Sequence, residues 1–427
     1  MREMKNSGTE WLSDIPHDWT LSNIGSLYTM RNVKVSDRDY PPLSVTMKGV
    51  VPQLETAAKT DAHDDRKLVK KGDFAINSRS DRRGSCGIAD RDGSVSLINT
   101  ILAPRTEMNP DYYNWLFHST SFADEFYRWG HGIVDDLWTT RWQEMKKIDV
   151  PVPSYDEQEK IAITLKNECS KVDELLANQE AQIEKLKAYK QSLITEVVTK
   201  GLDPNVPMKD SGVDEIGCIP ENYDIRKTLL CLDMPITDGP HTTPELFDEG
   251  IPFVSAEAVS CGNGGIDFSH IRGYISQEFY EECCKKYIPQ IDDIYMIKSG
   301  ATTGRVSIVS TDEVFTIWSP LAVFRCNSEV VVPKYLFYYL QSKCYQQQVE
   351  LGWSYGTQQN IGMRTLEKLK VVVPPLDIQN RIIEYLDHQF EKTNELISIK
   401  QLKIEKLNQY KKSLIYEYVT GKKEVSC

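Results

Sequence analysis

The 427-residue sequence lacks the features of a membrane or secreted protein. It has no run of about 18 apolar residues, the length that a membrane-spanning helix needs. Its start, "MREMKNSGTEWLSDIPHDW", has no apolar stretch of the kind found in secretory signals. We therefore expect a cytoplasmic protein with no membrane partner.

Paired cysteines and clustered histidines are also missing. The 10 cysteines form no CxxC pair, and Cys283 and Cys284 are adjacent, which suits neither a disulfide framework nor a zinc site. The 7 histidines are dispersed along the chain. We expect reduced thiols, no metal site and no cofactor bound by this chain.

Catalytic motifs are absent as well. The sequence contains no GxxxxGK[ST], HExxH or GxSxG, no GxGxxG after a strand, and no Asn-Pro-Pro-aromatic or Asp-Pro-Pro-aromatic motif of amino-methyltransferases. The stretch "GATTGR" (Gly300–Arg305) places its glycines too close together for a phosphate-binding loop and has Arg where Lys is required. We therefore predict a non-catalytic protein and assign no catalytic residue.

The chain has fewer basic than acidic side chains, with 50 Lys and Arg against 62 Asp and Glu. Its net charge is −12, and an acidic balance is unfavourable for nucleic acid because phosphate contacts depend on Lys and Arg. Net charge governs solubility and non-specific attraction, however, and does not determine what one face binds. Nucleic-acid binding is therefore not excluded.

What the sequence does contain is an internal repeat. "IEKLKAYKQSLI" (Ile183–Ile194) returns as "IEKLNQYKKSLI" (Ile404–Ile415). Val150–Thr199 and Val371–Thr420 align at a constant offset of 221 residues, with 22 identities in 50 positions and no gap. Upstream, "MKNSGTEWLSDIPHDW" is matched by "MKDSGVDEIGCIPENY". The chain is therefore a tandem duplication in which each copy has an opening motif, a variable body and a tail.

Each tail reads as one long helix. Asp156 and Asp377 are the predicted N-caps, and neither Pro nor Gly follows until Gly201 and Gly421. Apolar residues recur at steps of three and four, which is coiled-coil spacing. A helix of about 43 residues is some 60 Å long and outruns a body of about 150 residues. We therefore favour tails that pack on each other over tails that pack on their own bodies. The predicted packing residues are Leu176, Ile183, Leu186, Leu193, Ile397, Ile404, Leu407 and Leu414.

The bodies read as mixed α/β. Five strands are predicted, over residues 95–101, 251–254, 291–297, 305–309 and 314–323. "DYYNWLFHSTSFADEFYRWG" and "PKYLFYYLQSKCYQQQVELGW" are each predicted to be one amphipathic helix. The first body has no motif like "GATTGR", and its nearest stretch is "INSRSDRRGSCGI".

Several stretches together resemble the specificity subunits of type I restriction–modification systems, over essentially the whole chain. They are "SGTEWLSDIPHDW", "KIDVPVPSYDEQEKIA", "DGPHTTPELFDEGIPFVSAEAV", "KSGATTGRVSIV", "IWSPLAVFR" and "LKVVVPPLDIQNRI". The second copy departs from the pattern at Ile378, where the first has Glu157, and at Glu215, where the first has Trp11.

The resemblance implies an α+β fold with two mixed α/β target-recognition domains. Two long helices, packed as an antiparallel coiled coil, would join them in a pseudo-two-fold tandem repeat. The expected boundaries are 1–152 for the first recognition domain, 153–203 for the first spacer helix, 204–373 for the second recognition domain and 374–427 for the second spacer helix.

The resemblance also implies a function. Each recognition domain would read one half of a bipartite, asymmetric double-stranded DNA target, with a gap of about 5–8 base pairs. The expected protein partners are two modification (methyltransferase) subunits that use S-adenosylmethionine and two restriction subunits that use ATP and Mg²⁺. Methylation and cleavage would belong to those partners.

Candidate DNA contacts are polar or basic side chains in loops, since base edges are read by such groups. In the first body they are Ser78, Arg79, Arg82, Arg83, Thr139, Thr140 and Arg141. In the second they are His241, Thr242, Thr243, Lys298, Ser299, Thr302, Thr303, Arg305, Tyr355, Thr357, Gln358, Gln359 and Asn360. Each group also has a simpler interpretation as a solvated polar loop, a helix cap or a glycine-bearing turn.

The alternative function, of a different class, is a coiled-coil adaptor. In that case the two bodies would bind proteins and have no role on DNA. A self-sufficient methyltransferase is disfavoured by the missing motifs.

Overall fold

The computed structural model describes residues 2–53, 63–79, 82–132, 138–355 and 359–425, with only the backbone at positions 354 and 355. It falls into two compact units. Unit 1 comprises Met1–Glu180 and Gln401–Cys427, and unit 2 comprises Ala181–Lys400. Each unit therefore contains one body and about half of each long helix. In the part that the structure describes, no helix is both long and apolar enough to cross a membrane.

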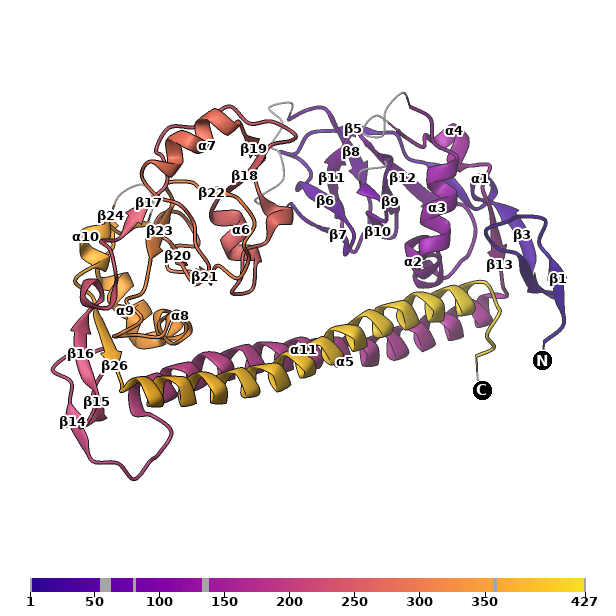
Figure 1. Ribbon diagram of the computed structural model, residues 1–427. Helices are drawn as coiled ribbons and strands as arrows, with labels where there is room; N and C mark the ends of the chain where they lie inside the picture. The colour runs from indigo at the N-terminus through magenta and orange to yellow at the C-terminus, as the bar shows by residue number, and fades with distance from the viewer. Residues whose placement is uncertain (1, 54–62, 80–81, 133–137, 356–358, 426–427) are drawn as a thin grey trace. The chain divides into compact units, whose positions relative to one another are not determined.

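Unit 1 contains the following strands and short helices, which precede the first long helix (Figure 1). They are β1 (Met4–Asn6), β2 (Asp14–Pro16), β3 (Thr20–Asn23), α1 (Ile24–Leu27), β4 (Tyr28–Met30), β5 (Lys34–Val35), β6 (Leu43–Thr46), β7 (Gly49–Pro52), β8 (Arg66–Val69), β9 (Phe74–Asn77), β10 (Cys86–Ile88), β11 (Gly93–Ser96), β12 (Asn99–Pro104), α2 (Pro110–His118), α3 (Thr120–Arg128), α4 (Trp142–Met145) and β13 (Asp149–Val152).

Unit 2 repeats this plan with insertions. Its elements are β14 (Met208–Asp210), β15 (Cys218–Pro220), β16 (Asp224–Lys227), a 3-10 turn (Thr228–Cys231), β17 (Thr237–Asp238), β18 (Ile251–Val254), α6 (Ala256–Cys261), a second 3-10 turn (Phe268–His270), β19 (Tyr274–Ile275), α7 (Gln277–Cys284), β20 (Ile294–Ile297), β21 (Val306–Ile308), β22 (Thr316–Ile317), β23 (Leu321–Phe324), α8 (Pro333–Gln341), α9 (Lys343–Leu351), β24 (Ser354–Tyr355), β25 (Gln359–Asn360), α10 (Met363–Leu366) and β26 (Lys370–Val373).

The two bodies are built on the same antiparallel sheet. In unit 1 the strand order is β10-β9-β12-β4, and in unit 2 it is β21-β20-β23-β17. The opening hairpins correspond as well, since β1 pairs with β2 and β14 with β15. The last strand of each body returns to an early one, β13 to β3 and β26 to β16. The duplication inferred from the tails therefore extends through both bodies.

The central strand of each sheet is buried on both faces. In β20, Ile294 and Met296 face one apolar cluster, whereas Tyr295 and Ile297 face the other. Successive side chains of a strand point to opposite faces, so a strand between two clusters is apolar throughout. This places the strand ends, and the loops that follow them, in fixed positions.

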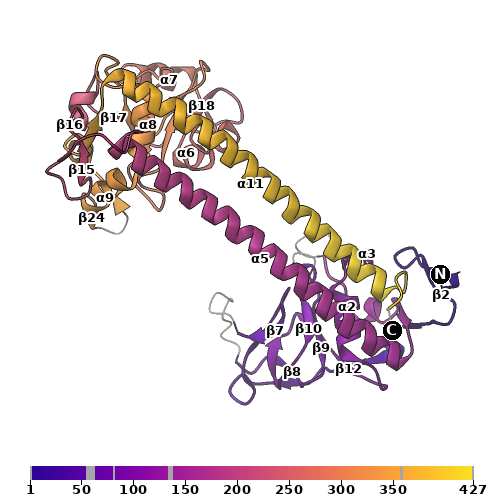
Figure 2. The same cartoon turned by 90° about the horizontal axis from the view of Figure 1, so that it is seen from below.

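The long helices are α5 (Tyr155–Lys200, 46 residues) and α11 (Leu376–Val419, 44 residues). They run side by side in opposite directions (Figure 2). In unit 1, Lys411 of α11 donates to Asp173 of α5 at 2.6 Å, and in unit 2, Lys190 of α5 donates to Asn394 of α11 at 2.9 Å. These matching contacts confirm the predicted antiparallel packing within each unit.

The apolar seam between these helices is confirmed in outline. Ile183, Leu193 and Leu414 are buried. The other predicted packing residues are half-buried, namely Leu176, Leu186, Ile397, Ile404 and Leu407. A two-helix seam has no third layer over it, so partial exposure of its side chains is expected.

Each body is attached to the far end of the opposite tail in the same way. Tyr112 of α2 donates its hydroxyl to the Val419 carbonyl at 2.9 Å, and Tyr335 of α8 donates to the Val198 carbonyl at 3.2 Å. Both carbonyls belong to the last turn of a helix, where backbone acceptors need partners from outside the helix. The two tyrosines thus cap equivalent helix ends in the two units.

Two glutamines fix the starts of the tails. Gln158 accepts from the Asn109 amide at 2.9 Å and donates to the Pro153 carbonyl at 2.9 Å. Gln379 accepts from the Val332 amide at 2.8 Å and donates to the carbonyls of Val330 at 3.1 Å and Pro374 at 2.8 Å. The glutamine of the repeated "VxVPxxDxQ" pattern therefore ties body to tail.

The departure at Ile378 has a structural reason. In unit 1, Glu157 accepts a hydrogen bond from Trp19 Nε1 at 2.8 Å and forms an ion pair with Arg2. In unit 2 the corresponding aromatic residue is Tyr223, and Ile378 packs against the apolar cluster to which Tyr223 belongs. An ionic contact in one copy is thus replaced by an apolar one in the other.

Several predicted elements were wrong in detail. Residues 95–101 and 314–323 are each broken by a turn, into β11 and β12 and into β22 and β23. Each predicted amphipathic helix is in fact two helices, because Ser119 and Ser342 leave the helical conformation and cap the helix that follows. The expected N-caps Asp156 and Asp377 instead lie in the first turns of α5 and α11.

Candidate nucleic-acid interface

A hairpin loop of equal length leaves the central strand in both units. In unit 1 it connects β9 to β10 over residues 78–85, and in unit 2 it connects β20 to β21 over residues 298–305. Both loops end at a glycine with positive φ, Gly84 at 73° and Gly304 at 91°, a backbone conformation that favours glycine. The expectation that unit 1 has no counterpart to "GATTGR" is therefore wrong, since "SRSDRRGS" occupies that place.

A second candidate segment pairs with the first residues of each hairpin loop. Arg79 forms an antiparallel bridge with Thr139, and the Thr140 amide donates to the Ser78 carbonyl at 3.0 Å. In unit 2, Ser299 bridges Asn360, and the Ile361 amide donates to the Lys298 carbonyl at 2.9 Å. Loops that are some 60 residues apart in the sequence therefore meet in each body, as a DNA-reading surface requires.

Two of the unit 1 candidates serve the fold. Ser78 is buried and shares a hydrogen bond with Thr100 at 2.9 Å. Thr140 is buried and donates its hydroxyl to the Phe126 carbonyl at 2.6 Å. These side chains hold the two segments together and are not exposed to a ligand.

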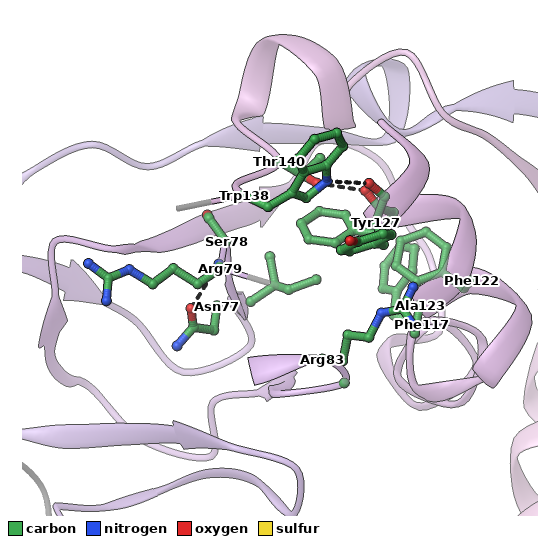
Figure 3. A pocket seen from close by; sticks show the side chains of 13 residues that line it. Asn77, Ser78, Arg79, Arg83, Phe117, Phe122, Ala123, Tyr127, Trp138 and Thr140 are labelled. Atoms are coloured by element: carbon green, nitrogen blue, oxygen red, sulfur yellow. Dashed lines mark hydrogen bonds between the residues drawn. The ribbon is translucent and has the colours of Figure 1, made fainter. Parts of the chain in front are cut away.

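The remaining unit 1 candidates lie at the surface. Arg79, Arg82 and Arg141 are exposed, and Thr139 is half-buried. Figure 3 shows the side chain of Arg79 extending away from the aromatic residues behind the loop. The predicted DNA contacts that remain at the surface are therefore mostly arginines, and they include both residues of the Arg79–Thr139 bridge.

Arg83 is held differently from Arg79. Its guanidinium lies 4.1 Å from the ring centroid of Tyr127 and 3.3 Å from an Asp124 oxygen. Tyr127 in turn stacks on Trp138, whose Nε1 donates to the Tyr127 carbonyl at 2.9 Å (Figure 3). Arg83 therefore lines an aromatic pocket, together with Tyr127 and Trp138, beside the hairpin loop.

In unit 2 the hairpin loop is held by hydrogen bonds within the loop and to Gln359 of the neighbouring segment. The Gly300 amide donates to the Gln359 carbonyl at 3.0 Å, and the Thr303 hydroxyl donates to the Gly300 carbonyl at 2.7 Å. Arg305 is exposed and donates to the Ser260 carbonyl at 3.2 Å. Thr302 is half-buried, as is Ser299.

The amide cluster that follows is described only in part. Gln359 and Asn360 are exposed. Thr357 and Gln358 lie outside the described residues, and the side chain of Tyr355 does too. The predicted contacts at these three positions stay predictions.

The third candidate segment of unit 2, "DGPHTT", is joined to the hairpin loop through a buried carboxylate. Asp238 is only 1% exposed. Its oxygens lie 2.5 Å from Lys286 Nζ, 3.2 Å from Lys298 Nζ and 3.2 Å from His241 Nε2. Burial alone raises the pKa of Asp238, but the hydrogen bonds from Lys286 and Lys298 outweigh it and hold the pKa below its ordinary value. Thr242 and Thr243, next to His241, are exposed.

Two features were missed from the sequence. One is Asp238 itself, the first residue of "DGPHTT", which lies three residues before His241 and is not among the predicted contacts. The other is a polar hollow in unit 1 lined by Arg105, Lys146 and Lys147 together with Trp142. Lys146 and Lys147 are adjacent in the sequence but Arg105 comes from a separate stretch, so the sequence does not show that the three cations lie together.

Metal chemistry finds no support in this region. Among the described residues, no group of three or more His, Cys, Asp or Glu side chains is placed to hold a metal ion.

Comparisons with known proteins connect these features to one family. Residues 240–406 match the model of the type I restriction modification DNA specificity domain. This stretch of the chain is similar to the type I specificity subunits. The matched residues include the "DGPHTT" turn after Pro240, the hairpin loop of unit 2 and the first part of α11.

Two curated relatives carry the same description. The chain is 27% identical over 282 residues to the putative type I restriction enzyme MjaX specificity subunit of Methanocaldococcus jannaschii, covering 65% of this chain and 60% of that protein. It is 24% identical over 247 residues to the type I restriction enzyme EcoBI specificity subunit of Escherichia coli, covering 56% and 51%. The chain thus matches between about half and three fifths of the length of these relatives.

Solved structures share the fold over nearly the whole chain. A chain from a structure concerned with complex assembly and conformational transition of the type I R-M system superposes with a TM-score of 0.67 at 15% identity, covering 95% of this chain and 98% of that one. The HsdS subunit from Thermoanaerobacter tengcongensis superposes with a TM-score of 0.50 at 16% identity, covering 97% and 99%. The predicted fold class is confirmed, and the relatives are named as specificity subunits and not as catalytic ones.

Proposed function

We propose that the chain reads a bipartite double-stranded DNA target, with one half-site for each unit. The observation that carries the proposal is the repeated pairing of a hairpin loop with a second segment, at Arg79–Thr139 in unit 1 and at Ser299–Asn360 in unit 2. Both pairs lie at the same end of a buried central strand. Because the loops are equal in length and different in side chains, the two units would read different bases.

The proposed protein partners are two modification subunits, and the helices offer an equivalent surface in each unit. Leu175 and Tyr410 of unit 1 are about half exposed, and so are Leu396 and Tyr189 of unit 2. The duplication relates Leu175 to Leu396 and Tyr189 to Tyr410. The register set by the Lys411–Asp173 ion pair brings residue 175 opposite residues 409 and 410.

These exposed apolar side chains indicate docking sites. Apolar side chains that lie together on an exposed surface are typical of protein-interaction sites. Two equivalent patches are suited to two copies of one partner. Restriction subunits would then join this assembly in the cytoplasm. S-adenosylmethionine, ATP and Mg²⁺ would be used by the partners and not by this chain.

The test is selection of DNA from a random pool by the full chain assembled with its modification subunits. The expected result is enrichment of two short conserved blocks separated by a fixed gap. Enrichment of a single block would leave only one unit as a DNA reader. Binding with no sequence preference would refute the proposal and favour a protein-binding adaptor. The full chain should also fail to bind labelled S-adenosylmethionine by itself.

A further inference from the structure

We propose that Asp238 is a positioning residue for base recognition by unit 2, because it joins the "DGPHTT" turn to the hairpin loop that starts at Lys298. The inference rests on the proposed function, since it concerns how unit 2 presents its contact residues. Asp238 does not itself touch DNA in this proposal.

Asp238 is buried, whereas the side chains that contact it reach increasingly toward the surface. Its side chain is 1% exposed, whereas that of Lys298 is 13%, that of Lys286 is 51% and that of His241 is 72% exposed. One buried carboxylate thus contacts two lysines and one histidine whose side chains are increasingly exposed. A buried charge needs paired charges to offset its lost hydration, so these contacts are strongly favoured over alternative arrangements.

Two of the three candidate segments of unit 2 contact this carboxylate, and the third is bonded to the backbone of Lys298. His241 lies three residues beyond Asp238 in the first segment. Lys298 begins the second, and its carbonyl accepts from Ile361 at the end of the third. Backbone bonds reinforce the junction, since Lys298 donates to the Pro320 carbonyl at 2.8 Å and Ser319 donates to the Pro240 carbonyl at 3.2 Å. A change at Asp238 is therefore expected to displace the "DGPHTT" turn and the start of the hairpin loop relative to each other.

Unit 1 has uncharged residues at the positions that correspond to Asp238 and Lys298. The equivalent of Lys298 is Ser78, which bonds to Thr100. The strand registers place Asn32 where unit 2 has Asp238, since β4 continues beside β12 as β17 runs beside β23. The ionic junction is thus specific to unit 2, and Asn is a side chain that this fold accepts at the position.

The test compares two conservative variants of the full chain, each assembled with the modification subunits. Asp238→Asn removes the charge of the junction. Asp293→Asn is the matched control, because Asp293 is also 1% exposed, pairs with Arg325 at 2.7 Å and lies at the opposite end of β20. Each variant loses one buried carboxylate, Asp238 at the end of β17 or Asp293 just before β20, but only Asp238 contacts a candidate loop.

The readout is base preference at each half-site, measured by DNA selection below the melting temperature of each variant. Arg79→Ala assigns one half-site to unit 1, so the other belongs to unit 2. Asp238→Asn is expected to lower the discrimination at the unit 2 half-site by about tenfold or more, the size of one lost base contact, with the unit 1 half-site unchanged. Asp293→Asn is expected to keep both preferences.

Three results would count against the proposal. Unchanged preference in Asp238→Asn would overturn it, and so would equal loss in Asp293→Asn. If Asp238→Asn does not fold, Lys298→Met removes the same ion pair from the other side, and full preference in that variant would also overturn it. A wild-type complex with no preference at either half-site would instead refute the proposed function itself.

Discussion

Arg79 and Arg83 give the sharpest test of DNA reading in unit 1, because they lie four residues apart in one loop with opposite surroundings. Arg79 is exposed beside the Thr139 bridge, and Arg83 is bound to Tyr127 and Asp124. Arg79→Ala should therefore affect base choice, and Arg83→Ala should affect the stability of unit 1.

The magnitudes follow from these contacts. A bidentate contact between arginine and a base edge contributes about 1–3 kcal/mol of discrimination, so Arg79→Ala should relax preference at one base pair by about 10- to 100-fold. Arg83 contributes a cation–π contact of about 0.5–1 kcal/mol at an exposed site and a surface ion pair of at most about 1 kcal/mol. Arg83→Ala should then cost unit 1 about 1 kcal/mol and weaken binding to all sequences alike.

The assay is a competition of single-base variants of the unit 1 half-site, together with denaturant unfolding of each variant. The reasoning is refuted if Arg79→Ala weakens binding equally on every sequence, because that is how a phosphate contact behaves. It is also refuted if Arg83→Ala relaxes the preference at a single base pair while unfolding is unchanged.

Three further predictions concern the tails. Gln379→Leu leaves three backbone groups without their side-chain partner, at about 1–3 kcal/mol each, whereas Gln158→Leu leaves two. Denaturant unfolding should therefore show a larger loss of stability for Gln379→Leu than for Gln158→Leu. The exposed Gln401→Ala is the control, and equal losses of stability in all three variants would contradict the role of these bonds. Inserting one helical turn into both α5 and α11 adds about 5.4 Å, between one and two base-pair rises of about 3.4 Å, so DNA selection should return a longer gap; an unchanged gap would rule out the helices as the spacer. Replacing Tyr189 and Tyr410 together by Ser should weaken binding of modification subunits at least tenfold in a titration, with unfolding unchanged because both side chains are about half exposed; unaltered affinity would exclude these patches as docking sites.

The tails could be predicted because their function preserves residue spacing. Leu186 and Leu193 are one heptad apart, as are Leu407 and Leu414, and an insertion into one helix alone would shift the register of the seam. The constant offset of 221 residues between the copies follows from that requirement. The partial burial of Leu186 and Leu407 could not be predicted, since spacing alone does not show how many helices share the seam.

The breaks within the bodies escaped prediction because single residues decide them. Ser119 and Ser342 lie in stretches whose apolar periodicity continues on both sides. A serine is compatible with a helix interior and is also a favoured cap, so tertiary packing determines which role it takes. The strand breaks near Leu97 and Trp318 are of the same kind, because an apolar residue in a turn resembles one in a strand.

The equivalence of the two hairpin loops was hidden for a related reason. The copies align at an offset of 204 residues in their openings and 221 in their tails, and the loops align at 220. Neither the offset of the openings nor that of the tails therefore brings "SRSDRRGS" onto "KSGATTGR", and the two share few residues. What they share is a loop of equal length that ends at a glycine with positive φ and leaves a buried strand.

That combination explains how one fold presents two different sets of contacts. The shared features are backbone ones, namely loop length, glycine conformation and the bridge to a second segment, and they set where side chains emerge. The side chains that emerge differ, with exposed arginines in unit 1 and threonines, Lys298 and amides in unit 2. The supports differ accordingly: an aromatic pocket closed by Arg83 in one unit and the buried Asp238 junction in the other. Exchange of a loop without its support should therefore fail to transfer base preference, whereas exchange of a whole body, whose supporting residues all lie within its own unit, should transfer it.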